Sequence, residues 1–274
     1  MERKFSFGWW TTGRDKAAVN LFKAALTAID NGIIAGDFAY LFMSKRREET
    51  PYCAEISELA QKRGIPVLEL SATSFMPDLR KGDREKWRAL YHEKIYELVR
   101  GFSCPLAVLA GYMWVLSPEI CSKIAAINLH PALPGGPAGT WQEVIWQLLQ
   151  TRAQKTGAMM HLVTPELDKG PPITFFSFPI VGPEWQNLWD EFFRLENELG
   201  FKGVMEEQGE NLPLFKRIRA EGEKRELPLI VQTLRAFSLG RLKAEAGGVL
   251  DESGSVLKEP VDLTTFVEEQ IRTS

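Results

Sequence analysis

Asn128 and His130 are polar residues two positions apart at the end of a short apolar stretch. The amide of an asparagine can donate a hydrogen bond to a developing oxyanion, and the imidazole of a histidine titrates near neutral pH. Because strand side chains alternate between two faces, we expect Asn128 and His130 to share one face. The pair suits acyl transfer, although a structural histidine beside an asparagine turn would have the same pattern.

Asp168 lies in a polar turn between two stretches that are typical of strands, 157–164 and 173–180. We expect these two stretches to pair like a hairpin and to complete the edge of a sheet. A carboxylate in this turn can orient a nearby histidine and raise its pKa. The sequence Asp168-Lys169-Gly170 is also a common turn for backbone reasons alone, so a structural interpretation of Asp168 stays open.

The residues that come before these motifs alternate between short apolar strands and amphipathic helices. Strands are expected at 5–10, 38–43, 66–70 and 106–110, and a long helix at 83–100. Nearly continuous apolar strands that alternate with helices are typical of a parallel sheet with both faces covered. We therefore expect a doubly wound α/β core, in which ligands bind beyond the carboxyl ends of the strands.

The loop 11–16 leads from the first expected strand into a helix. The free backbone N–H groups and the dipole of a helix N-terminus attract anions, and phosphate is the natural ligand. Arg14 and Lys16 add positive charge, and Gly13 and Asn20 are further candidates for this role. The alternative is a solvated loop whose charges contact only water.

Composition excludes several classes of protein. The chain has 274 residues, 45% hydrophobic and 25% charged, and a formal net charge of -3, which argues against nonspecific nucleic-acid binding. It contains no apolar run of 18 residues and no signal-peptide pattern. Its three cysteines have neither disulfide nor zinc spacing. We expect a cytoplasmic protein with no membrane or nucleic-acid partner, as a monomer or a homodimer.

The chain has three histidines, His92, His130 and His161, and they form no spaced cluster, so we expect no metal site. His92 belongs to the expected helix 83–100, where we expect it at the surface. The core is expected to occupy residues 1–182. Residues 183–274 are expected to form a C-terminal helical insertion on the same domain, followed by a closing helix at 228–239 and a hairpin at 249–257 with its turn around 252–254.

Four motifs in order give the chain a family resemblance: 109–113 (LAGYM), 128–134 (NLHPALP), 157–163 (GAMMHLV) and 166–171 (ELDKGP). Together they resemble the folate-dependent formyltransferases, and most of all the phosphoribosylglycinamide (GAR) formyltransferases. The resemblance implies a Rossmann-like formyltransferase fold. It also implies transfer of a formyl group from 10-formyltetrahydrofolate, as cosubstrate, to the amine of glycinamide ribonucleotide in purine biosynthesis.

The resemblance also implies roles for individual residues. Asn128 would stabilise the oxyanion, His130 would donate or move a proton, Asp168 would orient His130, and His161 would support them from behind. The folate-binding residues would be Met113, Trp114, Val115, Leu116, Thr164 and Leu167. The residues that bind the phosphorylated amine would be Gly13, Arg14, Lys16, Asn20, Gly111, Tyr112, Pro131 and Glu223.

The chain departs from the GAR enzymes at three places. The usual Gly-x-Gly-Ser-Asn phosphate element is absent from 11–16, Trp114 stands where arginine is common, and either Glu221 or Glu223 fits the glutamate near the amine. One alternative is therefore a formyltransferase for another amine, such as a nucleotide-linked amino sugar. Others are a formyltetrahydrofolate hydrolase, which tends to have a second histidine where Pro131 stands, and a binding protein without catalysis.

Overall fold

The computed structural model describes residues 5–245 and 248–273, and it divides the chain into two compact units. The first unit comprises Met1–Leu129, Met160–Ile173 and Ile230–Glu259. The second comprises the remaining segments, His130–Met159, Thr174–Leu229 and Pro260–Ser274. The expected division of the chain after residue 182 stays a prediction.

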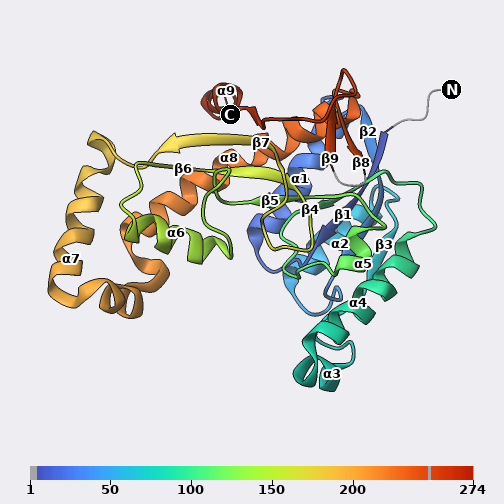
Figure 1. Ribbon diagram of the computed structural model, residues 1–274, viewed down its shortest axis with the longest axis horizontal. Helices are drawn as coiled ribbons and strands as arrows, with labels where there is room; N and C mark the ends of the chain where they lie inside the picture. Colours follow the sequence, from blue (N-terminus) through green and yellow to red (C-terminus); the bar gives the residue numbers. More distant parts are fainter. Residues whose placement is uncertain (1–4, 246–247, 274) are drawn as a thin grey trace. The chain divides into compact units, whose positions relative to one another are not determined.

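The first unit is built on a parallel sheet (Figure 1). Its strands follow the order β5-β4-β1-β2-β3, and these neighbours pair in parallel. The crossovers contain helices α1, α2, α3, α4 and α5, so the expected doubly wound α/β core is confirmed. The strands are β1 (Phe5–Thr11), β2 (Gly36–Met43), β3 (Val67–Glu69), β4 (Leu106–Leu109) and β5 (Ala126–His130). The helices are α1 (Lys16–Asp30), α2 (Pro51–Gln61), α3 (Pro77–Gly82), α4 (Arg84–Val99) and α5 (Pro118–Cys121).

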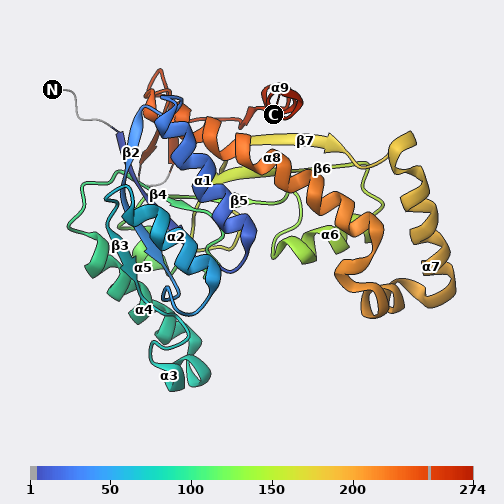
Figure 2. The ribbon, with the colours of Figure 1, turned by 180° about the vertical axis from the view of Figure 1, so that it is seen from behind.

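The two faces of this sheet receive different aromatic side chains because successive strand residues point to opposite sides. Trp9 packs on Phe22 of α1 with ring centroids 5.8 Å apart, and α1 and α2 cover that face in Figure 2. Trp10 belongs instead to a buried cluster with Trp87 and Tyr91 of α4. Both faces are therefore apolar and covered, which is why the strands read as continuous hydrophobic runs.

Side chains cap the starts of three helices. Asp15 caps α1 by accepting from the N–H of Ala18 at 3.2 Å, and Thr50 caps α2. Thr140 and Glu143 form a complete capping box at the start of α6 (Trp141–Gln150). These bonds satisfy amide groups that the first turn of a helix leaves without a partner.

The second unit contains the strand order β10-β7-β6, with β10 parallel to β7. We expected the pair formed by β6 and β7 to complete the sheet edge, and this was wrong, because β10 lies outside β7. Two residues are too few for a periodic pattern, so β10 escaped sequence analysis. The elements are α6, β6 (Lys155–Leu162), β7 (Pro172–Pro179), α7 (Pro183–Gln208), a 3-10 turn (Gly209–Asn211), α8 (Pro213–Ser238), β10 (Val261–Asp262) and α9 (Thr264–Thr273).

Helix α8 is longer than the sequence suggests, and it contributes residues to both units. We expected a separate helix to begin at Pro228, but α8 continues through this proline. Proline removes one backbone hydrogen bond and disfavours a helix interior, yet Leu229, Ile230 and Leu234 beyond it are fully buried. Burial of this apolar face outweighs the local cost.

A β-hairpin of β8 (Leu242–Glu245) and β9 (Gly248–Asp251) follows α8 in the first unit. The expected turn around 252–254 is also present, because the N–H of Leu257 donates to the carbonyl of Val249 at 2.8 Å. The strand β8 itself was missed. Among the described residues, no helix has the length and apolar character needed to cross a membrane.

Candidate active site

Three of the residues singled out in the sequence form a row in the first unit. Asn128 at the end of β5 places its Nδ2 atom 3.1 Å from Nε2 of His161 on β6. The same Nε2 atom lies 3.6 Å from Oδ1 of Asp168, and the side chains of His161 and Asp168 are only 3% and 7% exposed. Residues more than 30 positions apart thus meet at the ends of neighbouring strands.

The hydrogen bonds of His161 show which of its ring nitrogens carries the proton. Nδ1 of His161 lies 3.0 Å from the carbonyl oxygen of Leu162, so it must donate its proton there. In a neutral imidazole Nε2 is then an acceptor, and it receives one N–H of the Asn128 amide. The half-buried Asn128 keeps a second N–H and its oxygen for a ligand. A proton arriving at Nε2 would meet the carboxylate of Asp168.

The loop 163–171 holds Asp168 in an unusual backbone conformation. Asp168 has a φ of 53°, in the left-handed region, which costs about 1 kcal/mol for a residue with a side chain. The N–H of Leu162 donates to the carbonyl of Pro171 at 2.9 Å and closes the loop. Gly170 is required, because a Cβ there would come 1.6 Å from the Leu162 oxygen. The closed loop therefore holds the carboxylate beside His161.

His130 belongs to the second unit and is 2% exposed. Its Nε2 atom donates to the carbonyl oxygen of Pro137 at 2.8 Å, so Nδ1 is the basic nitrogen of the neutral ring. The proposed pairing of Asp168 with His130 stays a prediction. Pro131, the next residue, lines a small hollow with Trp141, Arg219 and Glu226.

The carboxyl ends of β1, β2 and β4 meet around Thr12. The N–H of Thr12 donates to the carbonyl of Gly111 at 3.0 Å, and its Oγ1 accepts from the N–H of Met113, also at 3.0 Å. The hydroxyl of Ser44 lies 2.9 Å from the same Oγ1 atom. Sequence analysis missed Thr12 and Ser44. The sequence feature that could have indicated them is that each is a hydroxyl residue directly after a buried strand.

The expected folate-binding segment forms what we call the 112–117 loop, between β4 and α5. Met113 is 40% exposed, and Trp114 and Val115 are half-buried. Tyr112 and Leu116 differ, because their side chains are buried in the core and only their backbone atoms can face a ligand. Their expected roles in binding are thereby limited to the main chain.

Trp114 lies between aromatic and basic neighbours. Its ring centroid is 5.2 Å from that of Trp87, and the guanidinium of Arg80 on α3 lies 6.0 Å from the ring. An arginine from another element therefore lies beside the Trp114 ring. In the other expected folate-binding loop, Leu167 is 50% exposed and Thr164 is half-buried.

The expected phosphate loop already contains anionic partners. Asp15 occupies the N–H of Ala18, the ammonium of Lys16 lies 3.1 Å from Glu55, and the guanidinium of Arg14 lies 3.5 Å from Asp15. Gly13 has a φ of 59° and packs so closely on α2 that a Cβ would lie 2.5 Å from Sγ of Cys53. The expected residue Asn20 is exposed on α1.

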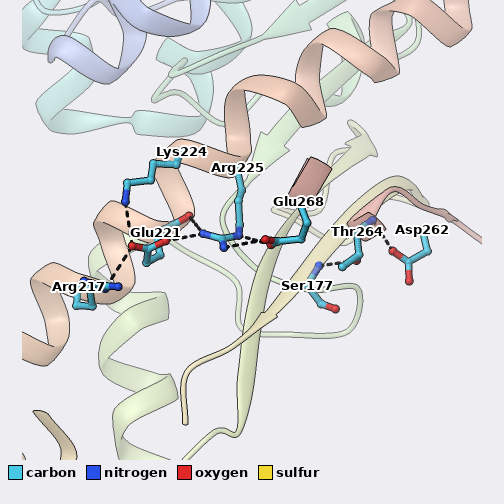
Figure 3. Close-up of polar contacts among 8 residues, drawn as sticks. All are labelled: Ser177, Arg217, Glu221, Lys224, Arg225, Asp262, Thr264 and Glu268. Carbon is cyan, nitrogen blue, oxygen red and sulfur yellow. Dashed lines mark hydrogen bonds and ion pairs between the residues drawn. The ribbon is translucent and has the colours of Figure 1, made fainter. Parts of the chain in front are cut away.

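The two glutamates left open by the sequence have different environments in the second unit. Glu221 contacts Arg217, Lys224 and Arg225, and Arg225 in turn contacts Glu268 of α9 at 2.6 Å (Figure 3). Burial acts to raise the pKa of Glu221, but the bonds from Arg225 and Lys224 outweigh it and lower the pKa. Glu221 is therefore committed to an ion-pair network.

Glu223 is paired with Arg219 at 2.8 Å and keeps a 45% exposed side chain. The same Arg219 also contacts Glu226 at 2.9 Å. Glu226 is 5% exposed and lines the hollow that contains Pro131. Sequence analysis missed Glu226, whose signal was an acidic residue within the apolar face of α8.

Comparison with known proteins gives these residues a family context. The family model described as "Formyl transferase" matches residues 22–187, more than half of the chain. The chain belongs to the formyl transferase family. A phosphoribosylglycinamide formyltransferase of Schizosaccharomyces pombe is 32% identical to it over 169 residues, which are 59% of this chain and 78% of the relative.

Solved structures of other proteins share the fold of this chain. The phosphoribosylglycinamide formyltransferase of Coxiella burnetii has a TM-score of 0.67 at 17% identity, covering 95% of this chain and 99% of its own. A formyltetrahydrofolate deformylase of Burkholderia mallei has a TM-score of 0.60 at 18% identity, covering 91% and 71%. At these identities the likeness concerns the fold alone, and the fold serves both transfer and hydrolysis.

Proposed function

We propose that this protein transfers the formyl group of 10-formyltetrahydrofolate to the amine of glycinamide ribonucleotide. The observation that supports this most directly is the row of Asn128, His161 and Asp168, in which an asparagine amide is oriented at the strand ends. The 32% identical relative from Schizosaccharomyces pombe is named for the same reaction. The four sequence motifs predicted the same activity.

The reaction requires a direct attack by the amine nitrogen on the formyl carbon. A C–N bond forms to give a tetrahedral oxyanion, the bond from the formyl carbon to N10 of the folate then breaks, and one proton moves from the amine to N10. The second N–H of Asn128 is the donor to this oxyanion. One such preorganised donor contributes on the order of 3 kcal/mol to transition-state stabilisation. His161 prevents the amide from rotating away.

His130 is the proposed proton carrier. Its Nε2 atom donates to the carbonyl of Pro137, so Nδ1 is the basic nitrogen of the neutral ring, and in this proposal it takes up the proton of the attacking amine and returns it to N10. The negative charge of Asp168, whose Oδ1 atom lies 3.6 Å from Nε2 of His161, is the electrostatic element of the proposed site. Both residues lie in largely buried positions, where such electrostatic effects are stronger than in water.

The folate is proposed to bind between the 112–117 loop and the loop 163–171. Met113 and Leu167 offer exposed apolar surface, while Trp114 offers a ring edge for the folate. Arg80, above Trp114, is placed to attract a folate carboxylate. Thr164 and the backbone of Val115 complete this proposed surface.

The phosphate of the amine substrate is proposed to bind at the loop 11–16. Arg14 and Lys16 are exposed, and they would exchange the carboxylates of Asp15 and Glu55 for the phosphate. Gly111 would contact the rest of the substrate, and the expected roles of Pro131 and Glu223 in the second unit stay predictions. Exchange of a carboxylate partner makes phosphate binding sensitive to salt.

Hydrolysis of formyl-folate is the second candidate, because the fold is shared with a deformylase. The test is an absorbance assay of 10-formyltetrahydrofolate consumption with and without glycinamide ribonucleotide. Acceptor-dependent consumption is expected, with formylated ribonucleotide as the product. Formate release at the same rate without the acceptor would identify a hydrolase, and turnover only with another amine would contradict the acceptor.

A further inference from the structure

His92 is buried in the first unit, with no exposed surface, although we expected it on the outside of α4. The expectation was wrong because α4 is covered on a second side by α5, in addition to its contact with the sheet. The sequence pattern of α4 indicates one apolar side, formed by Trp87, Tyr91 and Ile95. A histidine beside that stripe was therefore assigned to solvent.

Both ring nitrogens of His92 contact the 112–117 loop. The backbone N–H of Ser117 donates to Nδ1 at 3.0 Å, so Nδ1 carries no proton. The proton of the neutral ring is then on Nε2, which faces the hydroxyl of Tyr112 at 3.4 Å. One imidazole thus connects the first and the last residue of the loop.

The same helix also shapes the middle of the loop. Trp114 packs against Trp87, which lies five positions before His92 on α4. On the other side, the N–H of Met113 is held by Thr12. Polar contacts therefore hold Tyr112, Met113 and Ser117, while Met113 itself points a 40% exposed side chain outward.

We propose that His92 is a positioning residue that holds the 112–117 loop in the conformation that binds folate. This inference rests on the proposed function, because it assumes that the loop is part of a folate site. Without the acceptor at Nδ1, the buried N–H of Ser117 would lack its partner, and an unpaired buried amide is unfavourable. The loop would then rearrange, and Met113 and Trp114 would lose their alignment.

The state of the imidazole suits this role. Burial, followed by the positive charge of Arg88, lowers the pKa of His92 to about 4, while a hydrogen bond with the Arg88 backbone and the charge of Glu119 act in the opposite direction. Glu93 and Lys123 line a hollow beside the ring. At neutral pH the ring is therefore uncharged, and Nδ1 is available as an acceptor.

Substitution of His92 by asparagine or by glutamine distinguishes the contact with Ser117 from the contact with Tyr112. In His92→Asn, the side-chain oxygen can take the position of Nδ1 and accept from Ser117. In His92→Gln, the amide reaches the position of Nε2 near Tyr112 and leaves Ser117 without an acceptor. Both variants bury one side-chain amide, so a difference in folate affinity between them shows whether an acceptor for the Ser117 N–H is needed.

Three measurements test the proposal: the Kd for tetrahydrofolate, the KM values for both substrates, and hydrogen exchange of the peptide that contains 112–117. For His92→Gln we expect a tenfold or larger increase in the Kd and in the KM for formyl-folate, and faster exchange. The KM for glycinamide ribonucleotide should change less than twofold. His92→Asn should stay within threefold of wild type in every measurement.

Tyr40→Phe is the matched control, because the buried Tyr40 hydroxyl accepts from Trp10 Nε1 of β1 at 3.0 Å, and the substitution so removes a buried hydrogen bond to a strand and not to the loop. It should leave folate affinity and loop exchange unchanged. Wild-type folate affinity and exchange in His92→Gln would overturn the proposal, as would failure of both amide variants to fold, which would indicate a general structural role.

Failure of the proposed function has a different signature. A wild-type protein that binds folate but ignores glycinamide ribonucleotide would contradict the acceptor, while the comparison of His92→Asn and His92→Gln would still report on the loop. A wild-type protein with no affinity for tetrahydrofolate would overturn both inferences.

Discussion

The row of Asn128, His161 and Asp168 in the first unit differs in kind from the ion-pair network around Arg225 in the second. The row has one amide, one imidazole and one carboxylate, held by strand ends and a closed loop. The network joins Arg225 to Glu221 on its own helix and to Glu268 on α9 (Figure 3). The first arrangement leaves a donor for a ligand, whereas the second uses its charges on each other.

Because the two clusters differ in this way, we expect substitutions in them to have different effects. A row that orients one donor should affect turnover far more than folding, because its loss removes transition-state stabilisation. A network that joins two helices should affect folding of the C-terminal segment more than chemistry. Substitutions in the two clusters should therefore separate effects on turnover from effects on stability.

The largest effect is expected for Asn128→Ala. Loss of the proposed oxyanion donor should lower kcat by about 100- to 1000-fold, on the order of 3–4 kcal/mol. The free energy of unfolding should change much less, since Asn128 is only half-buried. Steady-state kinetics beside urea denaturation tests this pair of outcomes. Normal turnover with lost stability would place Asn128 in the core and not in the site.

The next effect concerns pH and His92. Its pKa of about 4 lies below the value of about 6.5 for an unfolded histidine, so between these values the unfolded chain binds the extra proton. Stability should therefore fall as pH falls from about 6.5 to 4, by up to about 3 kcal/mol from this group. Urea denaturation of wild type and His92→Asn across this range should show a shallower dependence in the variant. An equal pH dependence of stability in wild type and variant would contradict the role assigned to His92.

A smaller effect is expected for Glu268→Gln. The substitution removes the charge that faces Arg225 but keeps a polar group, and we expect a loss of about 1–2 kcal/mol of stability, with kcat for the folded fraction unchanged. A double-mutant cycle with Arg225→Met separates the pair from the loss of packing on Phe178. A large fall in kcat at full stability would link this network to the chemistry.

The smallest effect is expected for Arg194→Ala on α7. Arg194 pairs with Glu198 at 3.0 Å, but both side chains are more than half exposed. Such pairs on a helix surface contribute about 0.3–0.5 kcal/mol. Thermal unfolding should therefore be almost unchanged, which makes this variant the reference for the Arg225 network. A loss as large as that of Glu268→Gln would remove the distinction between surface and buried pairs.

Features that depend on neighbours along the chain can be predicted from the sequence. Thr50 and Thr140 cap α2 and α6, and a cap acts within three residues, so a short sequence pattern is enough to predict it. The alternation of strands and helices predicted the parallel core. The family motifs predicted the class of the protein, since four motifs in order seldom recur by chance.

Which side chains come into contact depends on the tertiary structure. His161 lies between Asn128 and Asp168, and His92 is buried between a loop and a helix, although in the sequence one is a lone histidine in an apolar strand and the other a lone histidine in a charged helix. Their roles depend on residues 7 to 33 positions away, beyond any local pattern. Burial by distant elements also carries α8 through Pro228, because packing energy summed over a face exceeds the local preference of one residue.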